Sequence, residues 1–106
     1  CEGLVDEENP DVYDALARRY LNIPCSCMTP NKGRLDLMGK LIGEYQPDAV
    51  VEIVLHACHT YAVESTTISR FVQNEYHIPY LKIETDYSTQ DIEQINTRIA
   101  ALIEML

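Results

Sequence analysis

The chain has 106 residues, of which 46% are hydrophobic, and its formal net charge at pH 7 is −9. This length and this hydrophobic fraction suffice for one domain with a packed core, so we expect a folded chain. Eight Lys and Arg residues cannot build the dense cationic face that a nucleic acid or an anionic membrane surface requires, and we expect neither as a partner.

The chain opens with CEGLVDEENP, without Met, so we interpret it as a piece cut from a longer protein. It contains no run of about 20 apolar residues, the length that spans a bilayer. It also shows no leader of charged and then apolar residues, the pattern of a secretion signal. We therefore expect a cytoplasmic protein.

Two helices are predicted in the first half. Asn9-Pro10 marks the start of the first, over 11–22, because Asn caps helices and Pro fits the first turn. Thr29-Pro30 repeats this signal, and apolar residues at helical spacing over 35–45 predict the second helix.

The second half alternates strands and helices. Residues 49–55, AVVEIVL, are β-branched and almost wholly apolar, which predicts a central parallel strand covered on both faces. A helical stripe over 63–76 follows, then a second strand over 78–85. Residues 89–106 give the clearest helix of the chain.

This order of elements predicts an α/β fold, a Rossmann-like three-layer lobe in which a small parallel sheet is flanked by helices. Two strands alone make a poor sheet. We therefore expect at least one more strand, upstream or within residues 1–5, and interpret the lobe as truncated. Residues 1–106 are assigned to this one lobe.

Polar residues follow both predicted strands. Cys58 lies between His56 and His59 directly after the first strand. The loop after the second strand carries Glu84, Asp86, Tyr87 and Ser88. In open α/β sheets ligands bind outside the carboxyl ends of the strands, so both loops are candidates for a functional site.

Cys58 allows four interpretations. It can be a small buried hydrophobic residue, a zinc ligand with His56 and His59, an acyl-transfer nucleophile with a histidine base, or one thiolate ligand of an iron–sulfur cluster. Zinc is disfavoured because Cys58 and His59 are adjacent, whereas paired zinc ligands are spaced by two or more residues. A single cysteine does not decide among the others.

Cys25 and Cys27 form a C-x-C pair. Cysteines at this spacing on an extended chain point to opposite sides and rarely bridge each other. We expect reduced thiols on a loop bounded by Pro24 and Pro30 in preference to extra metal ligands.

Four segments carry a resemblance to a known family: RYLNIPCSCMTPN, VLHACHTYAVES, IPYLKIETDYS and INTRIAALIEML. Together they resemble the C-terminal domain of the 2-hydroxyacyl-CoA dehydratase family. This family includes the 2-hydroxyglutaryl-CoA dehydratase subunits, the benzoyl-CoA reductase subunits and double-cubane-cluster proteins. The resemblance covers nearly the whole chain from Asn9 onward, and the ETDYS loop with the TRIxAxIEML ending is its most specific part.

The resemblance implies a full-length subunit with two Rossmann-like lobes and a [4Fe-4S] cluster between them, for which Cys58 is the ligand that this lobe contributes. It also implies a partner dehydratase subunit and an ATP-dependent activator protein that supplies one electron. The electron reaches the thioester of a 2-hydroxyacyl-CoA substrate, and the resulting ketyl radical anion expels the hydroxyl group. Soft thiolate ligands suit such a cluster.

The chain also departs from this family pattern. Many members have Cys-Asp where this chain has Cys58-His59, which we interpret as a subfamily difference. A cluster with ligands from two lobes cannot assemble on one, so we expect this piece alone to be metal-free and inactive. Two alternatives stay open: a double-cubane-cluster redox protein of the same family, and a metal-free α/β domain for subunit contacts. No catalytic residue is assigned.

Overall fold

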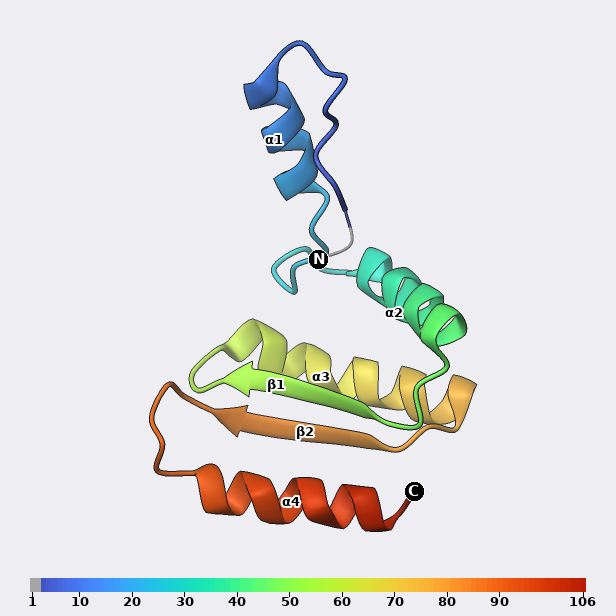
Figure 1. Cartoon of the computed structure of the whole chain (residues 1–106), viewed down its shortest axis with the longest axis vertical. Coiled ribbons are helices and arrows are strands. Elements are labelled where there is room, and N and C mark those ends of the chain that lie inside the picture. Colours follow the sequence, from blue (N-terminus) through green and yellow to red (C-terminus); the bar gives the residue numbers. More distant parts are fainter. Residues whose placement is uncertain (1–2) are drawn as a thin grey trace. The chain divides into compact units, whose positions relative to one another are not determined.

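A computed structural model of the chain describes residues 3–106. The chain divides into two compact units, Cys1–Asn31 and Lys32–Leu106. The first unit carries α1 (Val12–Leu21). The second unit carries α2 (Lys32–Tyr45), β1 (Val50–Leu55), α3 (His59–Phe71), the π-helical turn η1 (Val72–Tyr76), β2 (Tyr80–Thr85) and α4 (Ile92–Glu104) (Figure 1). The assignment of residues 1–106 to a single lobe stays a prediction.

Helix α1 forms where it was predicted, but Asp11, not Asn9, is its N-cap. The Asp11 side chain accepts hydrogen bonds from the backbone N–H groups of Tyr13 and Asp14, at 3.0 and 3.2 Å. Asn9 acts one step earlier, because its Oδ1 accepts from the backbone N–H of Asp11 at 3.0 Å. Carboxylate caps at this position also interact favourably with the helix dipole. In the same way α2 begins at Lys32, two residues after the proline that was expected to start it.

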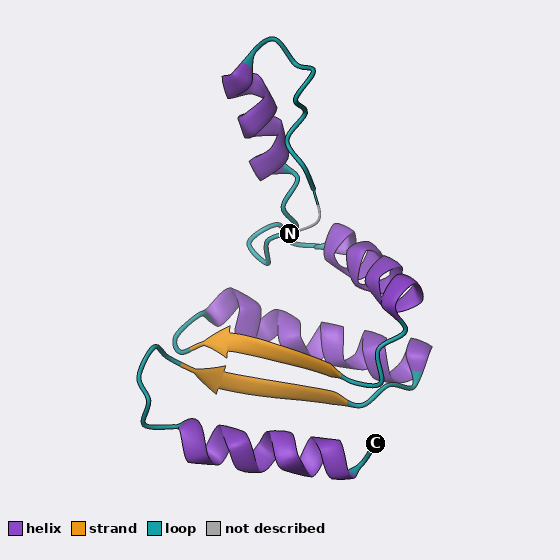
Figure 2. Cartoon of the chain, viewed as in Figure 1, coloured by secondary structure: helices purple, strands orange, loops and turns teal. Residues whose placement is uncertain are grey.

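The second unit has the predicted α/β architecture. Strands β1 and β2 pair in parallel, with Val50 opposite Tyr80 and Leu55 opposite Thr85. Helix α3 packs on β1 and α4 packs on β2, and the two helices lie on opposite sides of the sheet (Figures 1 and 2). The predicted three-layer arrangement of a small parallel sheet between helices is therefore confirmed.

The core of the second unit lies between α2, α3 and the first residues of the strands. Ile42, Ile68 and Val72 are 5%, 1% and 0% exposed and form its centre. The predicted helical stripe continues through η1, and His77, with a left-handed φ of 56°, ends it. The register of β1 and β2 is thereby anchored at the amino ends of the strands, while their carboxyl ends stay open at the opposite edge.

Strand β1 is covered on one face only, so the expectation that it is covered on both was wrong for the described residues. Glu52 and Val54 are 8% and 2% exposed. The outer face of β1 carries Val51, Ile53 and Leu55, which are 44%, 67% and 41% exposed. The reason is that α4 lies over β2, where Ile83 is 2% exposed. Of the additional strand expected near the N-terminus, residues 3–5 show none, and residues 1–2 lie outside the described part.

Candidate functional site at the carboxyl edge of the sheet

A tight turn delivers Cys58 to the carboxyl edge of the sheet. The backbone N–H of His56 donates to the carbonyl of Thr85 at 2.9 Å, which continues the pairing one residue beyond β1. Ala57 then adopts a left-handed φ of 63°, and the Cys58 N–H donates back to the Leu55 carbonyl at 3.1 Å. The predicted sequence of strand, cysteine loop and helix is confirmed.

Cys58 is the N-cap residue of α3, and its thiol is partly exposed. Its Sγ lies 3.9 Å from Oγ1 of Thr60, and its carbonyl accepts the Ala62 N–H at 3.0 Å. The site therefore presents a partly exposed cysteine sulfur at the carboxyl edge of the sheet.

His56 and Glu84 link the two loops of the edge. Nδ1 of His56 lies 3.0 Å from Oε1 of Glu84, and the two side chains are 51% and 45% exposed. They come from the ends of neighbouring strands, 28 positions apart in the chain. This pair fixes the orientation of the imidazole beside the cysteine turn. His59, on the first turn of α3, is exposed.

Asp86 closes the loop after β2. Its Oδ1 accepts the backbone N–H of Ser88 at 2.6 Å. Hydrogen bonds donated by Ser88 hold the pKa of Asp86 below its usual value. The bond from the Ser88 side chain has the largest effect, the bond from its backbone N–H a smaller one, and the charge of His56 contributes least of these three. Asp86 thus serves as a turn acid that stays ionised, and Tyr87 beside it is 92% exposed.

The edge carries one cysteine sulfur, that of Cys58. Within residues 3–106, no group of three or more His, Cys, Asp or Glu side chains is placed to hold a metal ion. A zinc site built from His56, Cys58 and His59 is therefore not formed. A partly exposed thiol at the end of a strand is compatible with a different donor set, in which Cys58 would provide one ligand and the others would come from outside the described residues.

The comparison with known proteins identifies the family. Residues 1–106, the whole chain, match the family described as 2-hydroxyglutaryl-CoA dehydratase, D-component. The chain belongs to this family. It is also similar to the "Putative dehydratase subunit YjiM" of Escherichia coli (strain K12), with 58% identity over 99 residues. These residues make up 93% of this chain and 26% of that relative, so the chain spans about a quarter of the length of the curated protein it matches.

This family membership confirms the resemblance expected from the sequence segments. It was those segments, and not the helix and strand pattern, that distinguished the dehydratase family from other α/β proteins. No helix within residues 3–106 is long and apolar enough to cross a membrane.

Cys25 and Cys27 lie in the first unit, and no disulfide joins them. The expectation that they point to opposite sides was wrong. The Met28 N–H donates to the Cys25 carbonyl at 2.9 Å, so the chain turns here instead of running extended. A side-chain hydrogen bond in which the Cys27 thiol donates to Cys25 raises the pKa of the Cys27 thiol.

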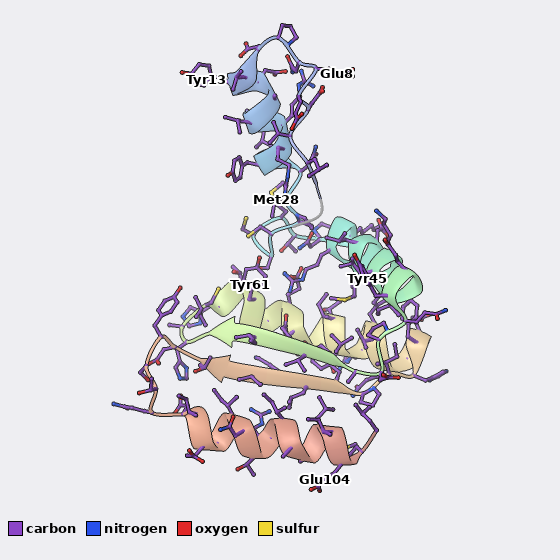
Figure 3. The ribbon with its side chains drawn as sticks, viewed as in Figure 1. Glu8, Tyr13, Met28, Tyr45, Tyr61 and Glu104 are labelled. Atoms are coloured by element: carbon purple, nitrogen blue, oxygen red, sulfur yellow. The ribbon has the colours of Figure 1, made fainter. Side chains whose placement is uncertain are left out.

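A buried ionic network behind the edge was not foreseen from the sequence. Arg34 of α2 lies between two acids, 3.1 Å from Glu52 Oε1 and 3.3 Å from Glu64 Oε2. Its Cζ lies 4.6 Å from the ring centroid of Tyr61, which Figure 3 labels on α3. The one sequence feature that indicated a buried ion pair was Glu52 itself, an acid inside the apolar run AVVEIVL.

Tyr80 completes this network from β2. Its hydroxyl donates to the second carboxylate oxygen of Glu52. Burial and the neighbouring Glu52 raise the pKa of Tyr80 well above its usual value. Because Glu52 is held by Arg34 on one oxygen and by Tyr80 on the other, the network ties α2, β1 and β2 together.

Proposed function

We propose that this chain is the lobe of a 2-hydroxyacyl-CoA dehydratase subunit that contributes one cysteine ligand, Cys58, to an iron–sulfur cluster. The parent enzyme removes water from a 2-hydroxyacyl-CoA thioester by one-electron, ketyl radical chemistry after ATP-driven activation. The observation that best supports the proposal is the partly exposed thiol at the carboxyl end of a parallel strand, in a chain that belongs to the dehydratase family.

The chain's own residues have separate roles in this proposal. When bound, a [4Fe-4S] cluster supplies single electrons at low potential. Cys58 holds it through its sulfur. The His56–Glu84 pair stiffens the turn that presents this sulfur, since residues behind a metal ligand commonly orient it.

The single sulfur sets what this chain can do alone. Because the described residues provide one candidate ligand at this edge, the other ligands come from elsewhere in the parent. We therefore propose that the isolated chain binds no cluster and has no dehydratase activity. A partner subunit and an ATP-dependent activator belong to the same proposal.

A second candidate is a metal-free α/β domain whose main role is subunit contact. The observation in its favour is the apolar outer face of β1, formed by Val51, Ile53 and Leu55. The two candidates differ in whether dehydration depends on Cys58.

The test is turnover of 2-hydroxyglutaryl-CoA by the intact parent enzyme with its activator and ATP under anaerobic conditions. Cys58→Ser is expected to abolish dehydration. Cys27→Ser, an exposed thiol in the first unit, serves as the matched control and is expected to retain it. Full activity of Cys58→Ser would refute the assigned role of the cysteine and favour the contact domain.

A further inference from the structure

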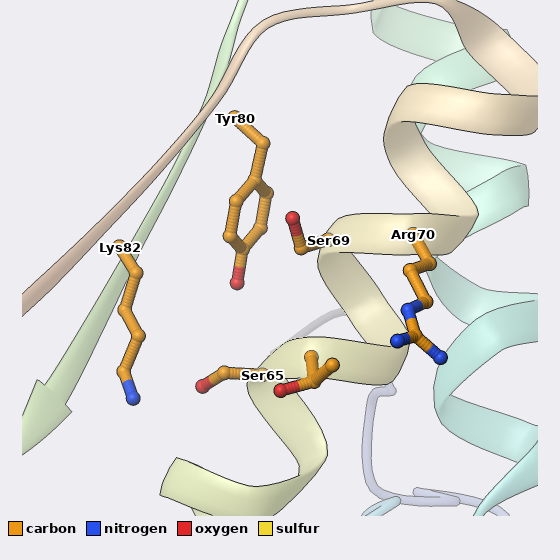
Figure 4. Close-up of a pocket in the computed structure, with 6 residues that line it drawn as sticks. Ser65, Ser69, Arg70, Tyr80 and Lys82 are labelled. Carbon is orange, nitrogen blue, oxygen red and sulfur yellow. The ribbon is translucent and has the colours of Figure 1, made fainter.

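A hollow of about 420 Å³ opens between α3 and β2, on the face of the sheet that α3 covers. Six residues line it: Ser65, Thr66, Ser69 and Arg70 from α3, and Tyr80 and Lys82 from β2. Figure 4 shows Tyr80 and Lys82 reaching from the strand toward the helix turns that carry Ser65 and Ser69, with Arg70 farther along the helix. No acidic side chain is among these six, although the chain has 17 Asp and Glu residues.

The cations at this hollow are not used by the fold. Within the described part of the chain, the Lys and Arg side chains that have no ion-pair or hydrogen-bond partner are Lys32, Arg70 and Lys82. Two of these three line the same hollow. In an acidic chain, such a pairing of free cations favours an anionic ligand.

The hydroxyl groups narrow the contacts that a ligand can make. Ser65 donates to the Tyr61 carbonyl at 2.8 Å, and the Tyr80 hydroxyl donates to Glu52. The Ser69 hydroxyl likewise donates to Oε1 of Gln73 at 3.3 Å. These protons are engaged, so Lys82 and Arg70 are the donors that remain for a ligand, together with the exposed Thr66. Glu52, which lies in the same register row as Lys82, already has Arg34 as its ion-pair partner.

We propose that this hollow binds a phosphate group. Resting on the proposed function, we assign that phosphate to the nucleotide end of the coenzyme A thioester. Lys82 and Glu84 point to the same face of β2, two positions and therefore roughly 7 Å apart along the strand. The hollow thus lies beside the edge that presents Cys58, on the strand that also forms that edge. Charge-assisted contacts from Lys and Arg are the usual means of holding phosphate oxygens.

The test measures binding, by calorimetry, to the intact subunit that carries this chain, without activator, ATP or turnover. The probes are coenzyme A and inorganic phosphate. Lys82→Gln and Arg70→Gln are each expected to weaken coenzyme A binding about tenfold, the effect of losing one charged hydrogen bond. The matched control is Lys32→Gln. Lys32 is also an unpaired cation, but it does not line the hollow, so this substitution is expected to leave the affinity for coenzyme A unchanged.

The other outcomes are also decisive. Equal affinity of Lys82→Gln and wild type, or an equal loss in Lys32→Gln, would overturn the site. If only inorganic phosphate binding responds to the two substitutions, the phosphate site stands and its assignment to coenzyme A is wrong. Because the measurement needs no cluster, a failure of the iron–sulfur proposal would leave this result unaffected. Thermal melts of each variant check that lost binding does not reflect lost folding.

Discussion

Arg34 holds two buried acids in one place and connects α2 to β1 and α3. Its side chain is 18% exposed, and those of Glu52 and Glu64 are 8% and 14% exposed. Buried carboxylates are tolerated only when they are paired and hydrogen-bonded. The guanidinium therefore decides whether the acid inside β1 is compatible with the fold.

Replacing Arg34 by Met is expected to lower the free energy of unfolding by about 3 kcal/mol, because it leaves two buried acids without their cation. Urea unfolding followed by circular dichroism measures the difference. Arg18→Met is the control, since its ion pair with Asp14 is exposed and little change is expected there. Comparable losses in the two variants would show that Arg34 does not hold the acids.

Tyr80 makes the free energy of unfolding depend on pH in the alkaline range. Its pKa in the fold is raised by burial and by Glu52, whereas an unfolded tyrosine titrates near pH 10. The stabilisation is complete below about pH 10 and is lost as the pH rises above it, because the unfolded chain releases this proton first.

Tyr80→Phe is expected to flatten the decline of the unfolding free energy above about pH 10. The measurement is a series of urea titrations between pH 8 and 11. Tyr87→Phe, at a residue that is 92% exposed, should keep the wild-type slope. A slope unchanged by Tyr80→Phe would contradict the raised pKa.

Single residues were predictable where the signal is local. The position of Cys58 followed from the end of an apolar run and the start of a helix pattern. The Arg34–Glu52 pair spans 18 positions, and the local sequence around either residue does not indicate which residue it pairs with. Only the packing of α2 against the sheet brings these two charges together.

At the scale of elements, two of the three glycines in α2 have very different surroundings. A Cβ added at Gly43 meets nothing within 4 Å, whereas one added at Gly39 lies 2.7 Å from the hydroxyl oxygen of Tyr76. The ring of Tyr76 is held edge-on against Phe71, with centroids 5.4 Å apart. Gly39 therefore permits the close approach of η1 to α2.

Gly43→Ala is expected to stabilise the fold by about 1 kcal/mol, since alanine is the better helix former. Gly39→Ala is expected to raise the free energy of unfolding by less than Gly43→Ala does, or to lower it, because the added methyl group displaces Tyr76. Thermal unfolding of both variants against wild type measures the pair. Equal stabilisation by the two alanines would show that Tyr76 is not held in place.

Element types were predictable because long apolar stripes carry a clear period, but element ends were not. Asn9-Pro10 and Thr29-Pro30 both gave helix signals slightly too early. At α1 the carboxylate of Asp11 caps the first turn in place of Asn9. Competition between neighbouring capping residues is settled by backbone geometry that the sequence does not state.

At the scale of the whole second unit, α4 covers the outer face of the sheet at β2, whereas the same face of β1 is exposed. Ile53 and Ile83 are opposite each other in the register, yet they are 67% and 2% exposed because α4 lies over β2. The apolar composition of β1 indicated burial on both faces. The composition of a strand does not indicate which helix packs on each of its faces, so the exposure of one face of β1 could not be predicted.

This register pair gives a direct test of the packing. Ile83→Ala is expected to cost about 3 kcal/mol of unfolding free energy, the usual penalty for truncating a buried isoleucine. Ile53→Ala is expected to cost less than about 1 kcal/mol, because its side chain is already largely in water. Chemical unfolding of the chain measures both, and equal penalties would mean that the outer face of β1 is covered in solution.

The central claim, that Cys58 is a cluster ligand, concerns the intact parent protein. The most direct measurement is anaerobic quantification of iron and sulfide, together with EPR, on the parent and on its Cys58→Ser variant. The account predicts a cluster signal in the wild type that is lost in the variant. An unchanged signal in the variant would contradict the role of Cys58, and iron absent from both proteins would contradict the cluster itself.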